Sequence, residues 1–314
     1  MVDIGYRAYQ PEGVLITTWQ NKELISSVLG LERARVAGTI LEARAILCDN
    51  RQNLIVDLNG IRGVIPREEA AIGSVADGQV RDIAIITRVG KPVCFKVLGI
   101  EYSPDGVPEV MLSRRAAQEE AQRAWVMKLR SGDIIDARIT HFEPFGCFVD
   151  IGCGIVSLLT IDAISVSRIS HPSDRFAIGQ TIRVVVRGID EESCKVTLTH
   201  KELLGTWEEN AAMFKAGQTS AGIVRSVEPY GIFIELSPNL AGLAEYKQGV
   251  SAGQNAAVYI KSIIPERMKV KLVLIDVYGN AQTPARVKYF AQGDRIRNWR
   301  YSPEGCEKEV YTEF

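Results

Sequence analysis

The sequence of 314 residues predicts an all-β protein built from small closed barrels in tandem, joined by short helical linkers. The chain repeats itself, its repeats contain short β-branched runs punctuated by glycine, and segments rich in helix-forming residues separate the repeats. Roughly four to five short strands in about 70 residues favour a closed barrel, because closure removes exposed sheet edges.

The clearest repeat lies in the second half of the chain. The segment EPFGCFVD (143–150) returns as EPYGIFIE (228–235), 85 positions later. Farther along, Gly179-Gln180 returns as Gly253-Gln254 at an offset of only 74. The later copy therefore lacks 11 residues, the difference between 85 and 74, in the region around 168–173.

An earlier and weaker copy precedes these two. Its segment 55–58 (IVDL) aligns with 148–151 (FVDI), and its ending 111–113 (MLS) aligns with 197–199 (TLT). This copy has Gln52 and Ile55 where the later copies have aromatic residues. We therefore expect a barrel that packs or docks rather than one that binds a ligand.

Together these repeats predict a division of the chain into seven parts. They are an N-terminal extension (1–33), a degenerate barrel repeat (34–115), a helical linker (116–130), a barrel repeat (131–200), a second helical linker (201–215), a third barrel repeat (216–276) and a C-terminal tail (277–314).

Local composition justifies these elements. Segments 134–139 and 181–186 are β-branched strands, and in the second Val184 and Val186 face one side while Arg183 and Val185 face the other. The first linker is rich in good helix formers. The tail contains Pro284, Gly293, Pro303 and Gly305, so we predict irregular structure there.

Composition excludes several classes of protein. The chain has 37 basic and 38 acidic residues, which counts against a duplex-DNA binder but not against a binder that works by stacking. It contains no apolar stretch of about 18 residues, and Met1–Arg7 does not resemble a secretion signal. The 6 cysteines form no C-x-x-C pair, which predicts reduced thiols in a cytoplasmic protein without zinc.

No catalytic motif is present. The sequence has only 3 histidines, no phosphate-binding G-x-x-x-x-G-K-[ST] loop and no G-x-S-x-G elbow. We therefore expect neither an enzyme nor a cofactor. His171-Pro172 is interpreted as a structural element of a loop.

The paired aromatics of the repeats are the candidate binding groups. Phe145 and Phe148 flank a glycine, as do Tyr230 and Phe233. On a regular strand, residues three apart point to opposite faces, so a bend at the glycine would be needed to bring both rings to one surface. Exposed rings stack on nucleobases of any identity. The residues alone favour this surface role and a core role equally.

The ordered features resemble a known family. Residues 132–201 contain the opening Gly132, an aromatic-Gly-x-Phe-Val-Asp hairpin (145–150), the pair Gly179-Gln180, a Val-x-Val strand (184–186) and an ending LTHK (198–201). This order is similar to the S1 RNA-binding domain, and the series of repeats over about residues 36–276 resembles the bacterial small-subunit ribosomal protein S1 family. The resemblance implies OB-fold barrels of five strands.

The resemblance also implies RNA-contacting positions. Its stacking aromatics fall on Phe145 and Phe148 and on Tyr230 and Phe233, and its frequent histidine is replaced by Thr160 and Glu245. Its aspartate falls on Asp190 in the middle copy, whereas the last copy has Ile264. Further candidates are the cationic residues Lys195, Lys269, Arg183 and Arg187.

The implied function is binding of single-stranded RNA, specifically messenger RNA in translation, with the small ribosomal subunit as a partner. Two alternatives stay open. One is an RNA-binding regulator that acts apart from the ribosome. The other is a protein-binding scaffold that has lost RNA affinity, which Thr160, Glu245, Ile264 and the balanced charge favour.

Overall fold

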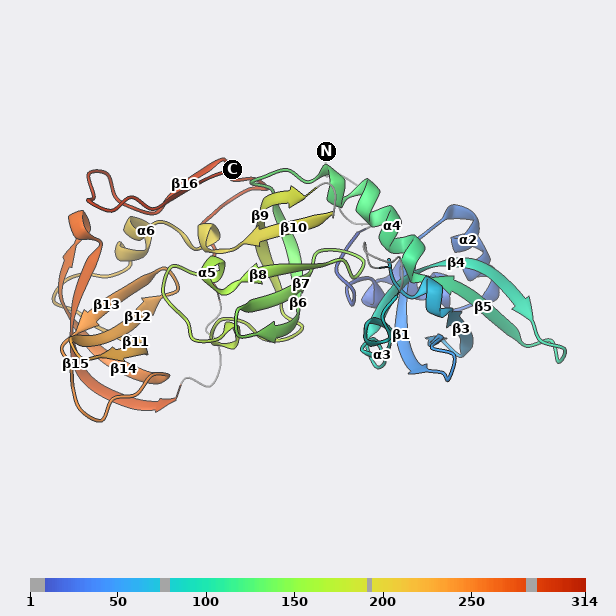
Figure 1. Cartoon of the computed structure of the whole chain (residues 1–314), viewed down its shortest axis with the longest axis horizontal. Coiled ribbons are helices and arrows are strands. Elements are labelled where there is room, and N and C mark those ends of the chain that lie inside the picture. Colours follow the sequence, from blue (N-terminus) through green and yellow to red (C-terminus); the bar gives the residue numbers. More distant parts are fainter. Residues whose placement is uncertain (1–8, 74–79, 191–193, 281–286) are drawn as a thin grey trace.

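Three closed five-stranded barrels lie in a row, with the first at the right of Figure 1 and the third at the left. This arrangement confirms the predicted all-β fold of tandem barrels. The computed structural model describes residues 9–73, 80–190, 194–280 and 287–314. Met1–Arg7, on which the expectation of no secretion signal depends, and Pro284 lie outside these residues.

All three barrels share one topology, in which the fifth strand lies between the third and the fourth. The third and fifth strands pair in parallel, and the other pairs are antiparallel. The strands of the first barrel are β1 (Leu41–Cys48), β2 (Leu54–Leu58), β3 (Ile61–Ile65), β4 (Pro92–Tyr102) and β5 (Pro108–Ser113). Those of the middle barrel are β6 (Ile134–Glu143), β7 (Gly146–Asp150), β8 (Val156–Thr160), β9 (Thr181–Asp190) and β10 (Lys195–Thr199). Those of the third are β11 (Thr219–Glu228), β12 (Gly231–Ser237), β13 (Leu240–Ala244), β14 (Gln254–Ile264) and β15 (Lys269–Asn280).

Helices occupy the connections and the first part of the chain. Leu31 and Ala34 of α2 pack into the core of the first barrel, so residues before the predicted boundary at 34 belong to that barrel. None of the helices in the described part of the chain is long and apolar enough to span a membrane. The α-helices are α1 (Trp19–Ile25), α2 (Val28–Ala37), α3 (Asp82–Ile86), α4 (Arg114–Ala124), α5 (Ile161–Ile164) and α6 (Trp207–Ala211). The 3-10 helices are η2 (Leu15–Thr17), η3 (Arg67–Glu69), η4 (Val126–Lys128), η5 (Pro172–Asp174), η6 (Lys201–Leu204) and η7 (Pro265–Arg267).

Strand alternation follows the predicted pattern. On β9, Val184 and Val186 point into the barrel core. Val185 points outward and is nevertheless fully buried, because Leu203 and Tyr289 pack over it. The outside of this barrel is therefore covered by the linker and the tail at this point.

The junction between the first and middle barrels is built around Glu12. Arg114 of α4 donates two hydrogen bonds to its carboxylate, at 2.7 and 3.1 Å, and the backbone N–H of Cys94 donates a third at 3.0 Å. Burial alone would raise the pKa of Glu12, but the Arg114 guanidinium lowers it. The backbone N–H of Glu12 in turn donates to Asp150 of the middle barrel at 2.7 Å.

Burial raises the pKa of two further carboxyl groups of this junction. Burial raises the pKa of Asp150 to about 7, and the nearby Glu12 charge contributes. Burial also raises the pKa of Glu42 to about 8. One oxygen of Glu42 accepts the backbone N–H groups of Gly13 and Ile16, whereas the other is buried without a hydrogen-bond donor.

The junction between the middle and third barrels contains a buried ion triad. Arg175 donates to both oxygens of Glu235 at 2.7 and 2.9 Å, and Arg225 donates to the same carboxylate at 2.9 Å. Arg175 directly follows η5, in the stretch that is longer in the middle repeat than in the last. His171 caps η5, as its predicted structural role requires.

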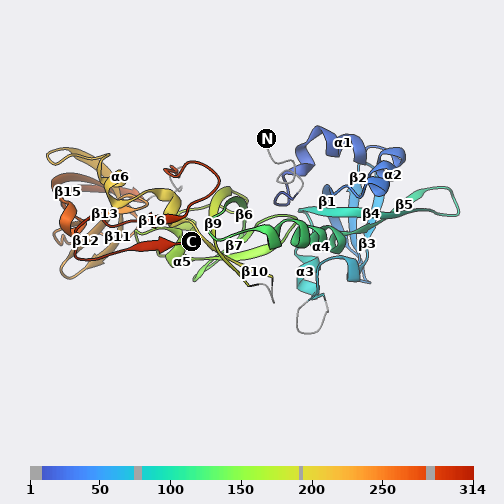
Figure 2. The ribbon, with the colours of Figure 1, turned by 90° about the horizontal axis from the view of Figure 1, so that it is seen from above.

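Most of the described tail is irregular, as predicted, but it contains two short strands and packs on the barrels. The strands β16 (Asn298–Arg300) and β17 (Tyr311–Glu313) pair, and Trp299 and Tyr301 enter the core of the third barrel. Residues 289–296 also bind the middle barrel, and Figure 2 shows the tail running along both. These contacts join residues distant in sequence, which local turn signals do not reveal.

Candidate nucleic-acid interface

A glycine starts the hairpin strand of both later barrels because a neighbouring backbone lies too close for a side chain. A Cβ on Gly146 would lie 2.4 Å from the carbonyl oxygen of Leu159, and one on Gly231 would lie 2.6 Å from that of Ala244. Real Cβ atoms do not approach so closely. The glycine thus allows β7 to pack against β8, and β12 against β13, right next to the aromatic residue.

The aromatic pairs lie on the surface in both barrels. Phe145 is 54% exposed and Tyr230 is 70% exposed. The rings of Phe145 and Phe148 meet edge to face with centroids 6.3 Å apart, and those of Tyr230 and Phe233 with centroids 6.1 Å apart. Of the surface and core locations that the residues alone left open, the structure therefore shows the surface location.

The pairs reach one surface for a simple reason. Phe145 and Tyr230 lie in the turns before β7 and β12, where strand alternation does not apply. Phe148 is on β7 between Cys147 and Val149, which both point into the core, so Phe148 points outward. The turn, rather than a bend within the strand, brings the two rings together.

Strand register extends this outer face on both sides of the aromatics. Directly opposite residues on paired strands point to the same face. In the middle barrel the outer row is His141, Phe148, Leu158 and Thr197. In the third barrel the corresponding row is Ser226, Phe233, Leu243 and Lys271. The two barrels therefore present equivalent surfaces of different composition.

His141 is a candidate that sequence reasoning missed. Its ring stacks on Phe148 with centroids 4.4 Å apart and planes 10° apart, and its side chain is exposed. Sequence spacing did not reveal the pair, because it forms only when β6 and β7 align. The alignment includes a register shift between Ile139 and His141.

The remaining predicted residues are distributed around this face. Lys195 is exposed on β10, two residues before Thr197, and therefore shares the outer face with Phe148. Asp190 pairs with Lys195 across β9 and β10. Thr160 pairs with Gly146, next to Phe145. In the third barrel, Lys269 is exposed and pairs with Ile264.

The two arginines predicted to contact RNA, Arg187 and Arg183, differ in their surroundings. Arg187 is exposed on β9. Arg183, in contrast, donates to the carbonyl oxygens of Ala291 and Gly293 at 3.2 and 2.6 Å, and its guanidinium lies over the ring of Tyr289. The prediction of Arg183 as an RNA-binding cation is therefore corrected: this side chain holds the tail on the middle barrel.

The described residues of the first barrel form no aromatic pair at these positions. Ile55 occupies the outer position that corresponds to Phe148 and is only 1% exposed. Gln52 lies in the hairpin turn with a φ of 65°. This barrel has no ring available for stacking on β2.

Comparison with known proteins agrees with the fold. The profile of the family described as "S1 RNA binding domain" matches residues 128–201, the whole of the middle barrel. The chain is 33% identical over 204 residues to the small ribosomal subunit protein bS1 of Leuconostoc lactis, covering 63% of this chain and 45% of the relative. The chain contains an S1 RNA-binding domain and is similar to bacterial ribosomal protein S1.

Other S1 relatives give a similar picture. The bS1 homolog of Bacillus subtilis is 29% identical over 234 residues, covering 73% of this chain and 57% of the relative. The chain thus spans about half the length of the curated S1 proteins it matches. Among solved structures, a multidomain protein with nucleic acid binding domains from Streptococcus pneumoniae covers 76% of this chain and 73% of its own, with 14% identity and a TM-score of 0.25. Nothing about function follows from so low a TM-score.

Proposed function

We propose that the chain binds single-stranded RNA through the outer faces of its middle and third barrels. Bases stack on Phe145 and Phe148 and on Tyr230 and Phe233, and neighbouring phosphates meet cationic side chains. The observation that carries this proposal is the recurrence of one edge-to-face aromatic pair, at 6.3 and 6.1 Å, on two barrels. Such rings accept any base, because every base has a π-face.

Polar groups complete the proposed site. Lys195 and Arg187 in the middle barrel, and Lys269 in the third, are exposed and would neutralise phosphates. Asp190 and Thr160 lie at the rim of the middle face and would accept or donate hydrogen bonds to ribose or base. The third barrel has Glu245 and Ile264 at the corresponding positions, so we expect the middle barrel to bind more tightly.

The cellular role that we propose is messenger-RNA binding in translation, in the cytoplasm and with the small ribosomal subunit as partner. The names of the bS1 relatives support this role. The proposed activity is binding rather than catalysis. Co-sedimentation with purified small ribosomal subunits at moderate salt tests whether the chain binds the subunit. Failure to co-sediment by a chain that binds RNA would favour a regulator that acts apart from the ribosome.

Fluorescence anisotropy with a labelled single-stranded RNA tests the binding face. The variant carries Phe145→Ala and Phe148→Ala, and circular dichroism checks its fold. We expect binding to weaken by about 2–6 kcal/mol if both rings stack on bases. A matched control is Tyr102→Ala with Tyr311→Ala, which removes two exposed rings that lie on other strands, β4 and β17. The control should bind as the wild type does.

Two outcomes would change the conclusion. If the folded double variant binds like the control, the aromatic pair is not the site. If the wild-type chain does not bind single-stranded RNA over a range of salt concentrations, the protein-binding scaffold becomes the better description. The replacement of the family's histidine by Thr160 and Glu245 is the observation that favours the scaffold.

A further inference from the structure

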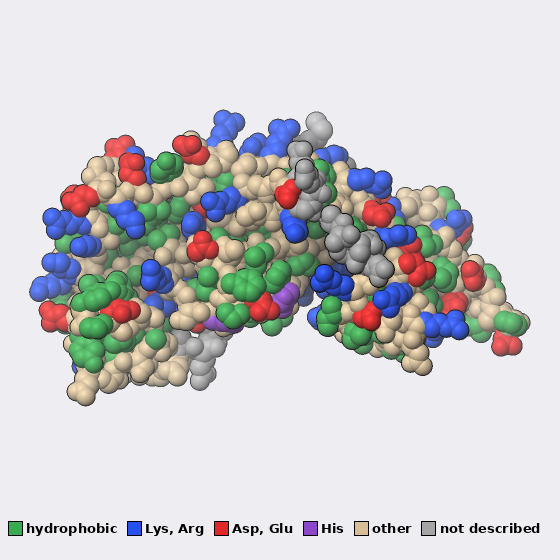
Figure 3. Space-filling model, in the orientation of Figure 1, with side chains coloured by type: hydrophobic (Ala, Val, Ile, Leu, Met, Phe, Trp, Pro, Cys, Tyr) green, Lys and Arg blue, Asp and Glu red, His purple; other side chains and the backbone are tan. Residues whose placement is uncertain are grey.

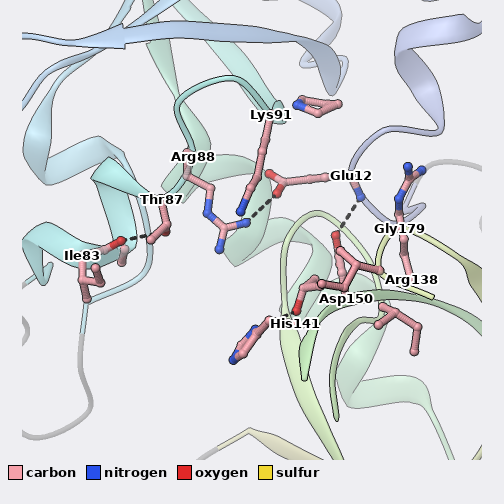
Figure 4. Close-up of a pocket in the computed structure, with 14 residues that line it drawn as sticks. Glu12, Ile83, Thr87, Arg88, Lys91, Arg138, His141, Asp150 and Gly179 are labelled. Atoms are coloured by element: carbon pink, nitrogen blue, oxygen red, sulfur yellow. Dashed lines mark hydrogen bonds and ion pairs between the residues drawn. The ribbon is translucent and has the colours of Figure 1, made fainter. Parts of the chain in front are cut away.

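A cleft of about 550 Å³ lies between the first and middle barrels (Figure 4). Thr87, Arg88 and Lys91 line it from the first barrel, and Arg138 and His141 line it from β6 of the middle barrel. In Figure 3 an indentation separates the two lobes, with Lys and Arg side chains on one side and histidine on the other. The aromatic face alone does not account for this concentration of cations.

The acidic residues of the cleft are already used inside the protein. Both oxygens of Glu12 accept hydrogen bonds from Arg114. Asp150 accepts the backbone N–H groups of Glu12, Gly152 and Gly154. Both carboxylates are buried, whereas Lys91 is exposed and Arg88 and Arg138 are half-buried. The mouth of the cleft is therefore positive.

Arg88 is only partly neutralised. Its closest carboxylate oxygen is Oε2 of Glu12 at 3.5 Å, and Arg114 binds the same oxygen at 3.1 Å. Its buried Nε has no hydrogen-bond acceptor. Burial lowers the pKa of Arg88, and the Arg114 charge adds to this effect. An anion in the cleft would relieve both the missing hydrogen bond and the repulsion.

The other two cations of the cleft are Lys91 and Arg138. Within the described residues, neither the Lys91 nor the Arg138 side chain has a hydrogen-bond or ion-pair partner. Gly13 leaves room for the Arg138 guanidinium, because a Cβ on Gly13 would lie only 2.9 Å from Nη1. Gly179 lies on the other side, where a Cβ would be at an ordinary contact distance of 3.7 Å from Nη2. The guanidinium thus lies against bare backbone, available to a ligand in the cleft.

The cleft is continuous with the aromatic face. His141 lines the cleft and also stacks on Phe148. Arg138 lies three residues before His141 on β6, roughly 10 Å along the strand. A strand of RNA with a base at Phe148 would therefore place its neighbouring phosphates within reach of the cleft.

We infer that this cleft binds the phosphate backbone of the RNA strand whose bases stack on the middle barrel, with Arg88, Lys91 and Arg138 as the phosphate ligands. The inference depends on the proposed function and deepens it, because it gives the first barrel a direct part in RNA binding. The site is composite: the rings come from the middle barrel, and two of the three cations come from the first.

The test measures RNA affinity over a salt series for the variant Lys91→Gln with Arg138→Gln. These two residues are chosen because neither holds the junction together, unlike Arg88. The control is Lys22→Gln with Arg33→Gln, which removes one lysine and one arginine that are exposed and lie outside the cleft. Losing two phosphate contacts should reduce the slope of log K against log salt by about 1.4, which is about 0.7 per contact. The control should keep the wild-type slope.

A second measurement identifies which phosphates of the RNA contact the cleft. RNA oligomers that carry one uncharged methylphosphonate linkage at successive positions should show one or two linkages that weaken binding to the wild type several-fold. These linkages should weaken binding less in the Lys91→Gln, Arg138→Gln variant, which keeps only Arg88 of the three phosphate ligands. Uridine monophosphate should compete only weakly, because the inferred ligand is a strand anchored on the rings.

The outcomes separate the two proposals. If the aromatic variant loses RNA binding while the cleft variant matches its charge control, the proposed function stands and the inference fails. If uridine monophosphate competes fully and no single linkage matters, the cleft binds free nucleotide and the inference about the strand is wrong. If the wild type binds no RNA, both proposals fail.

Discussion

His141 lies flat on Phe148, with ring centroids 4.4 Å apart and planes 10° apart. Phe145 meets the same Phe148 ring edge to face. The middle barrel therefore has three adjoining rings on its outer face. The third barrel has Ser226 at the position of His141, and so its face has two rings.

The substitution His141→Ala should weaken RNA binding by about 1–3 kcal/mol, because imidazole stacks on bases as other aromatic rings do. The side chain is exposed, so the midpoint of thermal unfolding should change little. His141→Phe is the matched control and should retain affinity. Tighter binding by His141→Ala in anisotropy titrations would contradict this prediction and show that the imidazole covers Phe148.

The reverse change should raise the RNA affinity of the third barrel. Ser226→His places an imidazole opposite Phe233, in the register that His141 has with Phe148. In a background that carries Phe145→Ala and Phe148→Ala, we expect RNA affinity to rise by about 1 kcal/mol, the lower end of a stacking contact. Ser226→Leu adds a side chain without a ring and serves as the control. Equal gains for both would rule out stacking as the cause.

Gly146→Ala should destabilise the middle barrel by about 1–3 kcal/mol, the usual range for overpacking. The reason is the 2.4 Å approach of the added Cβ to the Leu159 carbonyl oxygen. Gly188→Ala on β9 is the control, since its Cβ would meet no atom within 4 Å. Urea unfolding of both variants measures the difference. Equal stability would mean that β8 moves away at no cost.

Glu235→Ala should lower stability by about 3–5 kcal/mol, because it leaves two buried guanidinium groups without their carboxylate. The side chains of Arg175 and Arg225 are only 5% and 9% exposed. Glu309→Ala breaks the exposed pair with Arg300 instead and should change stability by about 0–1 kcal/mol. A small effect of Glu235→Ala on urea unfolding would mean that water replaces the carboxylate.

Glu42 should make the protein less stable as pH rises. Its pKa is about 8 in the folded chain and near 4.5 when unfolded, so the native state holds an extra proton between these values. Stability therefore falls as pH increases through this window. Asp150, with a pKa of about 7, acts in the same direction. Glu42→Gln should flatten the decline in unfolding free energy between about pH 5 and about pH 8, with the part from Asp150 remaining.

The pH dependence of stability that Glu42 contributes can be told apart from the contributions of other carboxyl groups. Glu235 contributes the opposite slope, because its hydrogen bonds to Arg175 outweigh burial and lower its pKa. Its stabilising contribution is lost as pH falls through the acidic range. If Glu42→Gln loses as much stability between about pH 5 and about pH 8 as the wild type, Glu42 is ionised in the folded chain and the prediction is wrong.

Much of the fold can be predicted from local sequence patterns. Alternation on β9 placed Val184 and Val186 in the core, and the repeat of segments 143–150 and 228–235 indicated equivalent hairpins. A strand alternates because successive side chains point to opposite faces, so local sequence is enough to predict it. The paired aromatics were identified in the same way, although their surface location was left open.

The tertiary structure decided what depends on residues far apart in the chain. Arg183 contacts Ala291, 108 positions away, and Glu12 contacts Arg114, 102 positions away. No local period marks such partners, and so the packing of the tail on the barrels, the contacts of Arg183 and the basic cleft could not be predicted from sequence.

His141 illustrates the division between what the sequence determines and what only the tertiary structure decides. The sequence by itself determined the barrels, their order and the positions of the four aromatic residues, because strand period and repeats are properties of adjacent residues. Only the tertiary structure decided which side chains meet on the outer face. The reason is physical: the His141–Phe148 contact requires the register between β6 and β7, including a shift after Ile139, and register is set by packing across strands.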